Sequence, residues 1–281
     1  PAWVWLTTAI VYVFMPILDA LIGDDKNDLL GLMDDEATQS TFYRWMVHML
    51  LPLIYLTWLI GAWAAVTLNF PWWAYLGLAV GHGWGLAFAI NSGHETGHKP
   101  DKISKWVALL MLAPSFLGHF RVEHNTGHHS DVATPRDPVT ARYNEGFHRF
   151  YPRVLRQSLV SSFQAEKAML ARKGKPWTDL SNPFFKYWAL QAGCLILAVV
   201  LGGWVGLGLF LLQAGVAIWQ LELVNYIEHY GLTRKHLGGA KYEHLQPRHS
   251  WNAAHKASNW LLINLQRHSD HHYKPDRRFP V

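Results

Sequence analysis

Histidine is frequent in this sequence, and many of its histidines gather in three short segments. The 281 residues include 17 histidines. The three segments read GHETGHK at 93–99, EHNTGHHSD at 123–131 and LQRHSDHH at 265–272. Residues three and four apart share one face of a helix, so each segment can direct at least two imidazole nitrogens at one point. Imidazole is the commonest metal ligand among side chains, and the spacing therefore predicts a metal site.

A further histidine in the string NYIEHYGL completes a set of nine candidate ligands. Nine imidazoles exceed the three or four ligands of one zinc ion, whereas two metals with four or five nitrogens each would use them all. Imidazole suits iron, copper and zinc, and open positions on a redox-active metal suit oxygen chemistry, so we predict two iron ions. The predicted ligands are His94, His98, His124, His128, His129, His229, His268, His271 and His272.

Carboxylates close to these histidines are candidates to accept the N–H of a ligating ring and so to fix its tautomer. We predict this role for Glu228, Asp270 and Asp137. For Glu95, Glu123 and Asp131 the alternative of a solvated acid or an arginine partner stays open. His249 and His255 precede the third segment and are candidates to brace it.

Long uncharged runs separate the histidine segments. A helix needs roughly 20 apolar residues to cross about 30 Å of hydrocarbon. The runs predict five spans, and LGGWVG at 201–206 is the predicted turn between the last two. The fold class is therefore an all-α integral membrane protein, a single membrane-embedded domain over residues 1–281, with spans at about 1–22, 45–68, 70–95, 187–201 and 204–229.

The distribution of Lys and Arg predicts the orientation of these spans. Of 25 such residues, 13 lie between Lys99 and Lys175 and nine between Arg234 and Arg278. Basic loops face the cytoplasm, so we predict a cytoplasmic, histidine-rich cap over 121–183 and 230–281 that holds the di-iron site. The hydrophobic run 103–120, interrupted by Pro114, is predicted to be a re-entrant or interfacial hairpin, which keeps all histidine segments on one side.

Composition excludes several other kinds of protein. A single cysteine, Cys194, allows no disulfide within the chain and no cysteine-ligated iron–sulfur cluster. The excess of Lys and Arg is explained by the orientation of a membrane protein and does not require nucleic-acid binding. The first residues lack the pattern of a signal peptide. An odd number of spans would place Pro1 on the outer side, so we expect the sequence to begin partway into a longer protein.

The strings GHETGHK, EHNTGHHSDVATPRDP, NYIEHYGL and HSWNAAH…LQRHSDHH resemble the membrane-bound alkane 1-monooxygenases in order and approximate spacing, over nearly the whole chain. Three histidine boxes alone would indicate only the wider superfamily of membrane fatty-acid desaturases and hydroxylases. The resemblance implies a non-haem di-iron enzyme of the bacterial inner membrane that inserts one oxygen atom of O₂ into the terminal C–H bond of an n-alkane. Matched residue by residue, the ligands would be the same nine histidines.

The resemblance also implies partners. Electrons would come from rubredoxin, reduced in turn by an NAD(P)H-dependent reductase. A cationic surface that includes Arg136, Arg142, Arg149, Arg153 and Arg156 would receive an acidic electron carrier or an anionic lipid surface. In the family, a bulky residue five places before the proline of MPILDAL limits substrate length. Val11 stands there, so we expect longer alkanes to be accepted. The family usually has six spans and a further C-terminal segment, whereas this sequence shows five spans and stops at Val281, and both differences fit a sequence that lacks its ends.

Two alternative functions remain open. Another member of the superfamily, a fatty-acyl desaturase or an aromatic-methyl hydroxylase, would share the three histidine boxes. A histidine-rich membrane metal transporter or sensor would instead place ionisable residues along a path at mid-bilayer. The predicted spans 1–22, 45–68 and 187–201 contain almost none, which disfavours transport.

Overall fold

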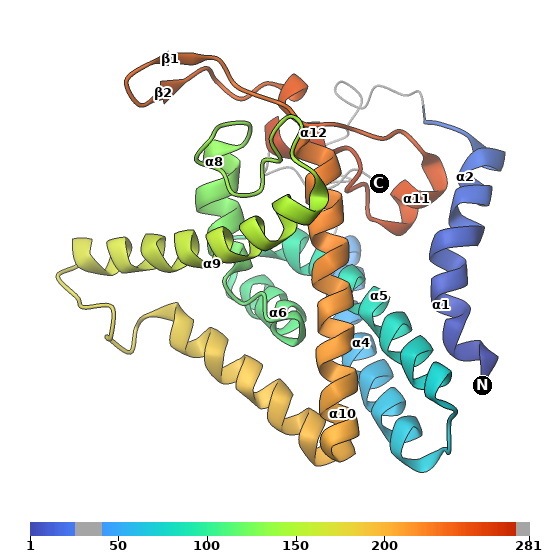
Figure 1. Cartoon of the computed structure of the whole chain (residues 1–281). Coiled ribbons are helices and arrows are strands. Elements are labelled where there is room, and N and C mark those ends of the chain that lie inside the picture. Colours follow the sequence, from blue (N-terminus) through green and yellow to red (C-terminus); the bar gives the residue numbers. More distant parts are fainter. Residues whose placement is uncertain (26–40, 274–281) are drawn as a thin grey trace.

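The computed structural model describes residues 1–25 and 41–273. Helices make up most of this part, and they divide into a bundle and a cap at one end of it (Figure 1). The part of the predicted cap at 274–281 lies outside the described residues. The all-α membrane fold predicted from the sequence is confirmed, with one addition: a short antiparallel hairpin pairs β1 (His236–Gly238) with β2 (Lys241–Tyr242).

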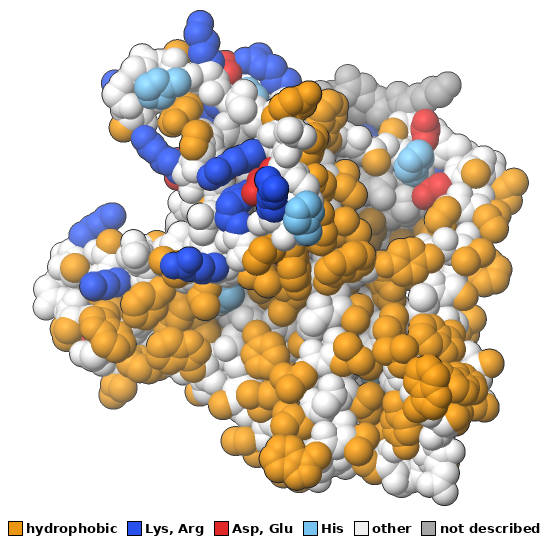
Figure 2. All heavy atoms as spheres, in the orientation of Figure 1, with side chains coloured by type: hydrophobic (Ala, Val, Ile, Leu, Met, Phe, Trp, Pro, Cys, Tyr) orange, Lys and Arg blue, Asp and Glu red, His pale blue; other side chains and the backbone are white. Residues whose placement is uncertain are grey.

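Within residues 1–25 and 41–273, four helical stretches are long and apolar enough to cross a membrane, namely Ala2–Ile22, Arg44–Thr67, Trp72–Gly97 and Pro183–His229. Many of their apolar side chains point outward, and Trp204 is 83% exposed. Figure 2 shows these hydrophobic side chains over the lower part of the molecule, whereas Lys and Arg gather over α9 and the β hairpin. Contiguous apolar surface of this extent belongs in lipid, so the chain is a membrane protein.

The first stretch is built from four short pieces. These are η1 (Ala2–Trp5), α1 (Leu6–Ala9), the π-helical η2 (Ile10–Phe14) and α2 (Met15–Ile22). Proline has no backbone N–H, so Pro16 removes one donor from the helix and the turn before it widens. The stretch therefore turns Val11 and Met15 toward the interior of the protein, where both line a cavity.

The longest helix, α10 (Pro183–His229), is broken once. Gly203 has φ 56° and ψ −144°, a conformation that only glycine adopts readily. In Figure 1 the two halves of α10 meet at an acute bend at the base of the molecule. The sequence predicts two spans at 187–201 and 204–229 joined by a turn, and the structure has its break between two helical halves inside the LGGWVG string.

Three helices pack together beneath the histidines. α4 (Thr41–Thr67), with Pro52 inside it, and α5 (Trp72–Gly97) form a helical pair, and the second half of α10 packs on α5. A Cβ atom at Gly83 would come within 2.6 Å of the Val216 side chain, so glycine allows α5 and α10 to approach closely. The core at this junction consists of Leu86, Ile90, Leu112, Leu117, Phe120 and Ala217.

The predicted hairpin at 103–120 corresponds to a sharply bent helix pair. α6 (Lys102–Leu112) continues into η3 (Ala113–Ser115), and Phe116 then adopts a left-handed conformation with φ 57°. The following helical stretch, α7 (Phe120–Val122), η4 (Glu123–His128) and α8 (His129–Asp131), departs at 119° from the first. The bend directs the second histidine segment back toward the end of α5.

The cap contains α9 (Phe147–Arg172), the β hairpin, η5 (Pro247–His249), α11 (Lys256–Leu261) and α12 (His268–Tyr273). It is joined to the N-terminal helix by a set of contacts that we call the clasp. The Ser258 N–H donates to Asp19 at 2.9 Å, and Arg267 pairs with Asp25 at 2.8 Å. His255 Nδ1 lies 2.9 Å from an oxygen of Asp24. Through the clasp, the N-terminal segment and the segment around α11 enclose one cavity.

Candidate metal centre

Five imidazoles meet at the end of α5. The Nε2 atom of His94 lies 2.7 Å from Nε2 of His124, 3.0 Å from that of His271 and 3.4 Å from that of His98. His129 Nε2 lies 2.9 Å from His124 Nε2 and 3.1 Å from His271 Nε2. One ligand atom from each ring falls within 4.8 Å of all the others. We call this group the five-histidine cluster.

Four other imidazoles, from η4, α10 and α12, form a neighbouring group, the four-histidine cluster. It consists of His128, His229, His268 and His272, all buried. His268 Nε2 lies 3.0 Å from His229 Nε2 and 2.9 Å from His272 Nε2. The ring centroids of His129 and His272 are 4.6 Å apart, so the two clusters adjoin. All nine predicted histidines are therefore in one of the two clusters.

The histidines do not divide between the two clusters as the spacing of an α-helix would predict. His124 and His128 are four apart, yet they belong to different clusters, whereas His124 and His129 share one. The reason is that η4 is a π-helix, in which hydrogen bonds join residues five apart. The His129 N–H accordingly bonds to the His124 carbonyl. Wider turns place residues i and i+5 on one face and leave His128 to point at the other group.

Asp137, one of the predicted supporting carboxylates, lies beside a ring of the four-histidine cluster. Its Oδ2 lies 2.9 Å from His128 Nδ1 and accepts a hydrogen bond from the Thr140 hydroxyl at 2.6 Å, and its Oδ1 accepts from the Val139 N–H. Burial raises the pKa of Asp137, but the charge and hydrogen bond of His128 and the Thr140 hydroxyl lower it, and the balance lies below its ordinary value. A carboxylate so placed fixes the ring with Nε2 toward the cluster.

The other predicted supporting residues are placed differently. Glu228 Oε2 lies 3.4 Å from His268 Nε2, which is the nitrogen that faces the cluster. It therefore stands on the ligand side of the ring and does not hold the ring from behind. His255 pairs with Asp24 in the clasp and does not brace a ligating ring. Asp270 is half-buried in α12, and His249 lies beside Glu243, 3.3 Å away.

The chemistry of the donor set fits a metal in each cluster. Burial lowers the pKa of His268, His271 and His272 well below the ordinary value, so these rings are neutral at pH 7, the form in which imidazole binds a metal. Each neutral ring has one donor and one acceptor nitrogen, and five Nε2 atoms that face one another cannot all be satisfied by mutual hydrogen bonds. A cation at the common point accepts every lone pair. All-imidazole sets suit iron, copper or zinc.

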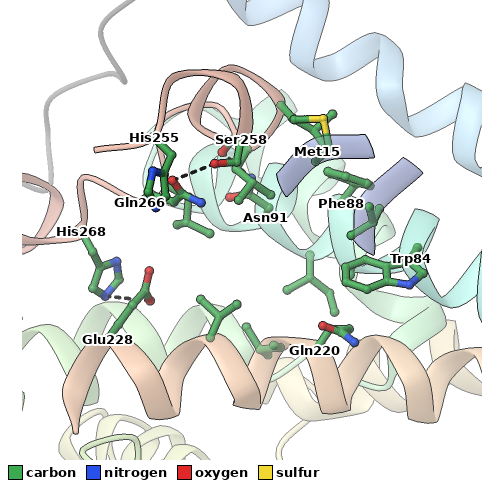
Figure 3. A pocket seen from close by; sticks show the side chains of 18 of the residues that line it. Met15, Trp84, Phe88, Asn91, Gln220, Glu228, His255, Ser258, Gln266 and His268 are labelled. Atoms are coloured by element: carbon green, nitrogen blue, oxygen red, sulfur yellow. Dashed lines mark hydrogen bonds and ion pairs between the residues drawn. The ribbon is translucent and has the colours of Figure 1, made fainter. Parts of the chain in front are cut away.

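A cavity of about 730 Å³ runs from the clusters toward the N-terminal helix. His94, His124 and His268 lie on its wall with Glu228, and Figure 3 shows Trp84 at the end opposite His268. Most of its lining is apolar, from α2, α5, α10 and α11. Trp84 precedes His94 by ten residues, which corresponds to roughly 15 Å along α5. Val11 lies on the cavity wall.

Several cavity residues were not predicted from the sequence. Asn91 donates to the Leu262 carbonyl at 2.6 Å and ties α5 to the segment before α12. Gln220 donates to the Tyr12 hydroxyl at 2.7 Å, and the Tyr12 ring packs edge-on against Trp84 at 4.9 Å. In the sequence, Asn91 and Gln220 are marked only as uncharged polar residues inside apolar spans. Their partners lie far away in sequence, so their function could not be inferred.

An all-helical membrane bundle with buried imidazole clusters beside an apolar cavity defines a membrane-bound metalloprotein. Residues 70–280 match the fatty acid desaturase family. The chain is similar to an alkane 1-monooxygenase of Pseudomonas putida, 35% identical over 98% of this chain and 68% of the relative. It is also similar to alkane 1-monooxygenase 1 of Alcanivorax borkumensis, 36% identical over 99% and 69%. A xylene/toluene monooxygenase hydroxylase component of Pseudomonas putida matches at 28% identity over 66% and 49%.

The chain belongs to the alkane 1-monooxygenase family, within the wider fatty acid desaturase family. The family and the histidine clusters together support an iron site.

Proposed function

We propose that this protein is a non-haem di-iron monooxygenase that converts medium- to long-chain n-alkanes to 1-alkanols. The observation that carries the proposal is the apolar cavity that ends on His94, His124 and His268. An alkane has no polar group to recognise, so an elongated apolar space presents it by shape alone and brings one end of the chain to the histidines. The names of the relatives support the choice of alkane and of carbon 1.

The two groups of imidazoles support one iron in each, held by five rings and by four rings. Bound iron would supply the redox chemistry that activates O₂. The protein's own residues have other tasks. Asp137 holds His128 in one orientation, and Glu228 places a carboxylate between the four-histidine cluster and the cavity. The apolar wall keeps water from the reacting carbon.

Hydroxylation balances only with an external reductant. One atom of O₂ enters the C–H bond, and the other leaves as water after the uptake of two electrons and two protons. We propose rubredoxin as the electron donor, itself reduced by a reductase that uses NAD(P)H. Exposed Arg142, Arg149 and Arg156 support an acidic partner. Arg153 does not belong to this surface, because it pairs with Glu145 at 2.7 Å and bonds two carbonyls.

The direct test is product formation by purified protein in lipid nanodiscs, supplied with iron, rubredoxin, its reductase and NADH. Octane should yield 1-octanol, and the alcohol oxygen should carry the label of ¹⁸O₂. Metal analysis of the same sample should give two irons per chain. Active protein with less than one iron per chain would contradict the di-iron assignment, and label arriving from water would contradict a monooxygenase.

The relative that acts in xylene and toluene oxidation favours one second candidate, hydroxylation of an aromatic methyl group. A fatty-acyl desaturase is the further alternative within the superfamily. The same assay with xylene or an acyl-CoA in place of octane separates these activities by their products. A faster rate with xylene than with every alkane from octane to hexadecane would favour the aromatic substrate.

A further inference from the structure

A second hollow, of about 280 Å³, lies outside the apolar cavity that reaches the histidines. It is enclosed by α6, by the start of α10 and by one turn of α9, and no histidine of either cluster lines it. Its polar lining differs from that of the alkane cavity because it is dominated by cations. These are Lys102, Lys105, Arg121 and Lys186, with Glu166 as the lone carboxylate among the lining residues.

The cations come from three helices, α6, α7 and α10. Within residues 1–25 and 41–273, none of the four forms an ion pair with a carboxylate within 4.0 Å. The Arg121 guanidinium is held in place because its Nε donates to the Gly97 carbonyl at 3.0 Å. The Lys186 ammonium is held over the Trp106 ring, 4.6 Å from its centre. The hollow therefore presents positioned positive charge to an anion.

The remaining wall of the hollow is apolar. Trp106, Leu109 and Leu112 contribute from α6, and Pro183 and Tyr187 contribute from α10. α6 carries its charges at its start: Lys102 and Lys105 lie in its first turn, and the run from Trp106 to Leu112 is uncharged. Ile103 and Trp106 are 57% and 47% exposed. Charge and exposed hydrocarbon thus meet at this site, as they do at a membrane–water interface.

We propose that this hollow binds the headgroup of an anionic phospholipid, with its phosphate among the four cations. The charge of the lining requires an anion, and the apolar wall and the exposed face of α6 favour one attached to acyl chains. A cation near an anionic lipid surface contributes about 1 kcal/mol, and four cations held together by α6, α7 and α10 bind one phosphate more selectively than a diffuse basic surface does. The lipid would join α6, α9 and α10 beside the bend that follows α6, beneath the five-histidine cluster.

Lipid retention tests the proposal without any assay of hydroxylation. The whole protein is reconstituted in nanodiscs of equal parts phosphatidylcholine and phosphatidylglycerol, then released into detergent and weighed by native mass spectrometry. Wild type should retain phosphatidylglycerol in preference to phosphatidylcholine. Lys105→Gln and Lys186→Gln should each lower that preference about fivefold. Lys167→Gln is the matched control, because Lys167 is exposed on α9 and does not line the hollow.

Two further measurements separate binding from damage to the fold. Lys186→Arg preserves the charge and should restore retention, and the iron content of each variant reports whether the neighbouring clusters are intact. Equal retention of both lipids by wild type, or unchanged retention by both glutamine variants, would overturn the proposal. Displacement of the retained lipid by excess inorganic phosphate would also overturn it, because a free anion would then suffice.

Discussion

Asp137 links the four-histidine cluster to the loop that precedes α9. Its three hydrogen-bond contacts leave it little freedom, and it is 3% exposed. We expect Asp137→Asn to lower iron retention and 1-octanol formation about 10- to 100-fold, because a neutral amide holds the His128 ring less firmly and makes it less basic. Inductively coupled plasma analysis and gas chromatography measure the two effects.

Asp179→Asn is the matched control for this substitution. Asp179 lies in the loop between α9 and α10, where its carboxylate bonds to Ser181 and Lys175 and to no cluster histidine within the described residues, so its change should leave both quantities as in wild type. Full iron content and an unaltered rate in Asp137→Asn would show that the carboxylate does not position the ligand.

The neutral histidines make metal-free protein sensitive to acid. Burial, helped by Lys99 and Arg121, lowers the pKa of His98 from 6.5 to about 4. The unfolded chain then binds protons more readily than the folded one as pH falls below about 6.5, so stability is lost between that value and about pH 4. The midpoint of thermal unfolding of apoprotein should therefore fall across this range. An unchanged midpoint would mean that the rings are solvated.

At the residue scale, spacing was sufficient to predict all nine clustered histidines. It could not predict their partition, because helical periodicity assumes an α-helix and η4 is a π-helix. It also could not distinguish Asp137, which faces Nδ1 of a ring, from Glu228, which faces Nε2. That distinction depends on side-chain direction in the folded protein.

The bend of α10 depends on one glycine. Any side chain at Gly203 would be strained by its φ of 56° and ψ of −144° even though space is open around it. We expect Gly203→Ala to cost about 1–3 kcal/mol of stability, measured by thermal unfolding in detergent. Gly208→Ala is the control, because Gly208 is in regular helix and nothing lies within 4 Å of an added Cβ. Equal midpoints for the two variants would contradict a glycine requirement.

The N-terminal helix sets one wall of the alkane cavity. Val11→Trp would fill part of that space, so the rate of hexadecane oxidation should fall roughly tenfold relative to octane in a competition assay. Val13→Trp is the control, because Val13 is 51% exposed and does not line the cavity. An unchanged product ratio in Val11→Trp would show that chain length is limited elsewhere.

At the element scale, the apolar runs and the glycine pair of LGGWVG predicted the long helices and the break in α10. The β hairpin was not predicted, because His236–Gly238 and Lys241–Tyr242 are too short to show an alternating pattern. The clasp was equally out of reach, since Asp19 and Ser258 are 239 residues apart and no pattern in the sequence relates them.

For the whole molecule, orientation in the membrane is the property to test. We propose that the cap faces the cytoplasm of a bacterial inner membrane, on the basis of its excess of Lys and Arg. In a Cys194→Ala background, Lys241→Cys in the β hairpin should react with a membrane-impermeant maleimide only after spheroplasts are permeabilised. Trp204→Cys, at the bend of α10, should react in intact spheroplasts. The reverse pattern would place the clusters on the outer side.

Through the clasp, the N-terminal segment closes one wall of the substrate space, whereas all nine clustered imidazoles come from residue 94 onward. Exchange of residues 1–25 with the matching segment of a relative would thus transplant one wall and leave the metal ligands native. Such chimeras would allow the range of substrates to be changed by exchange of this one segment, provided that Asp19, Asp24 and Asp25 keep their contacts with the cap.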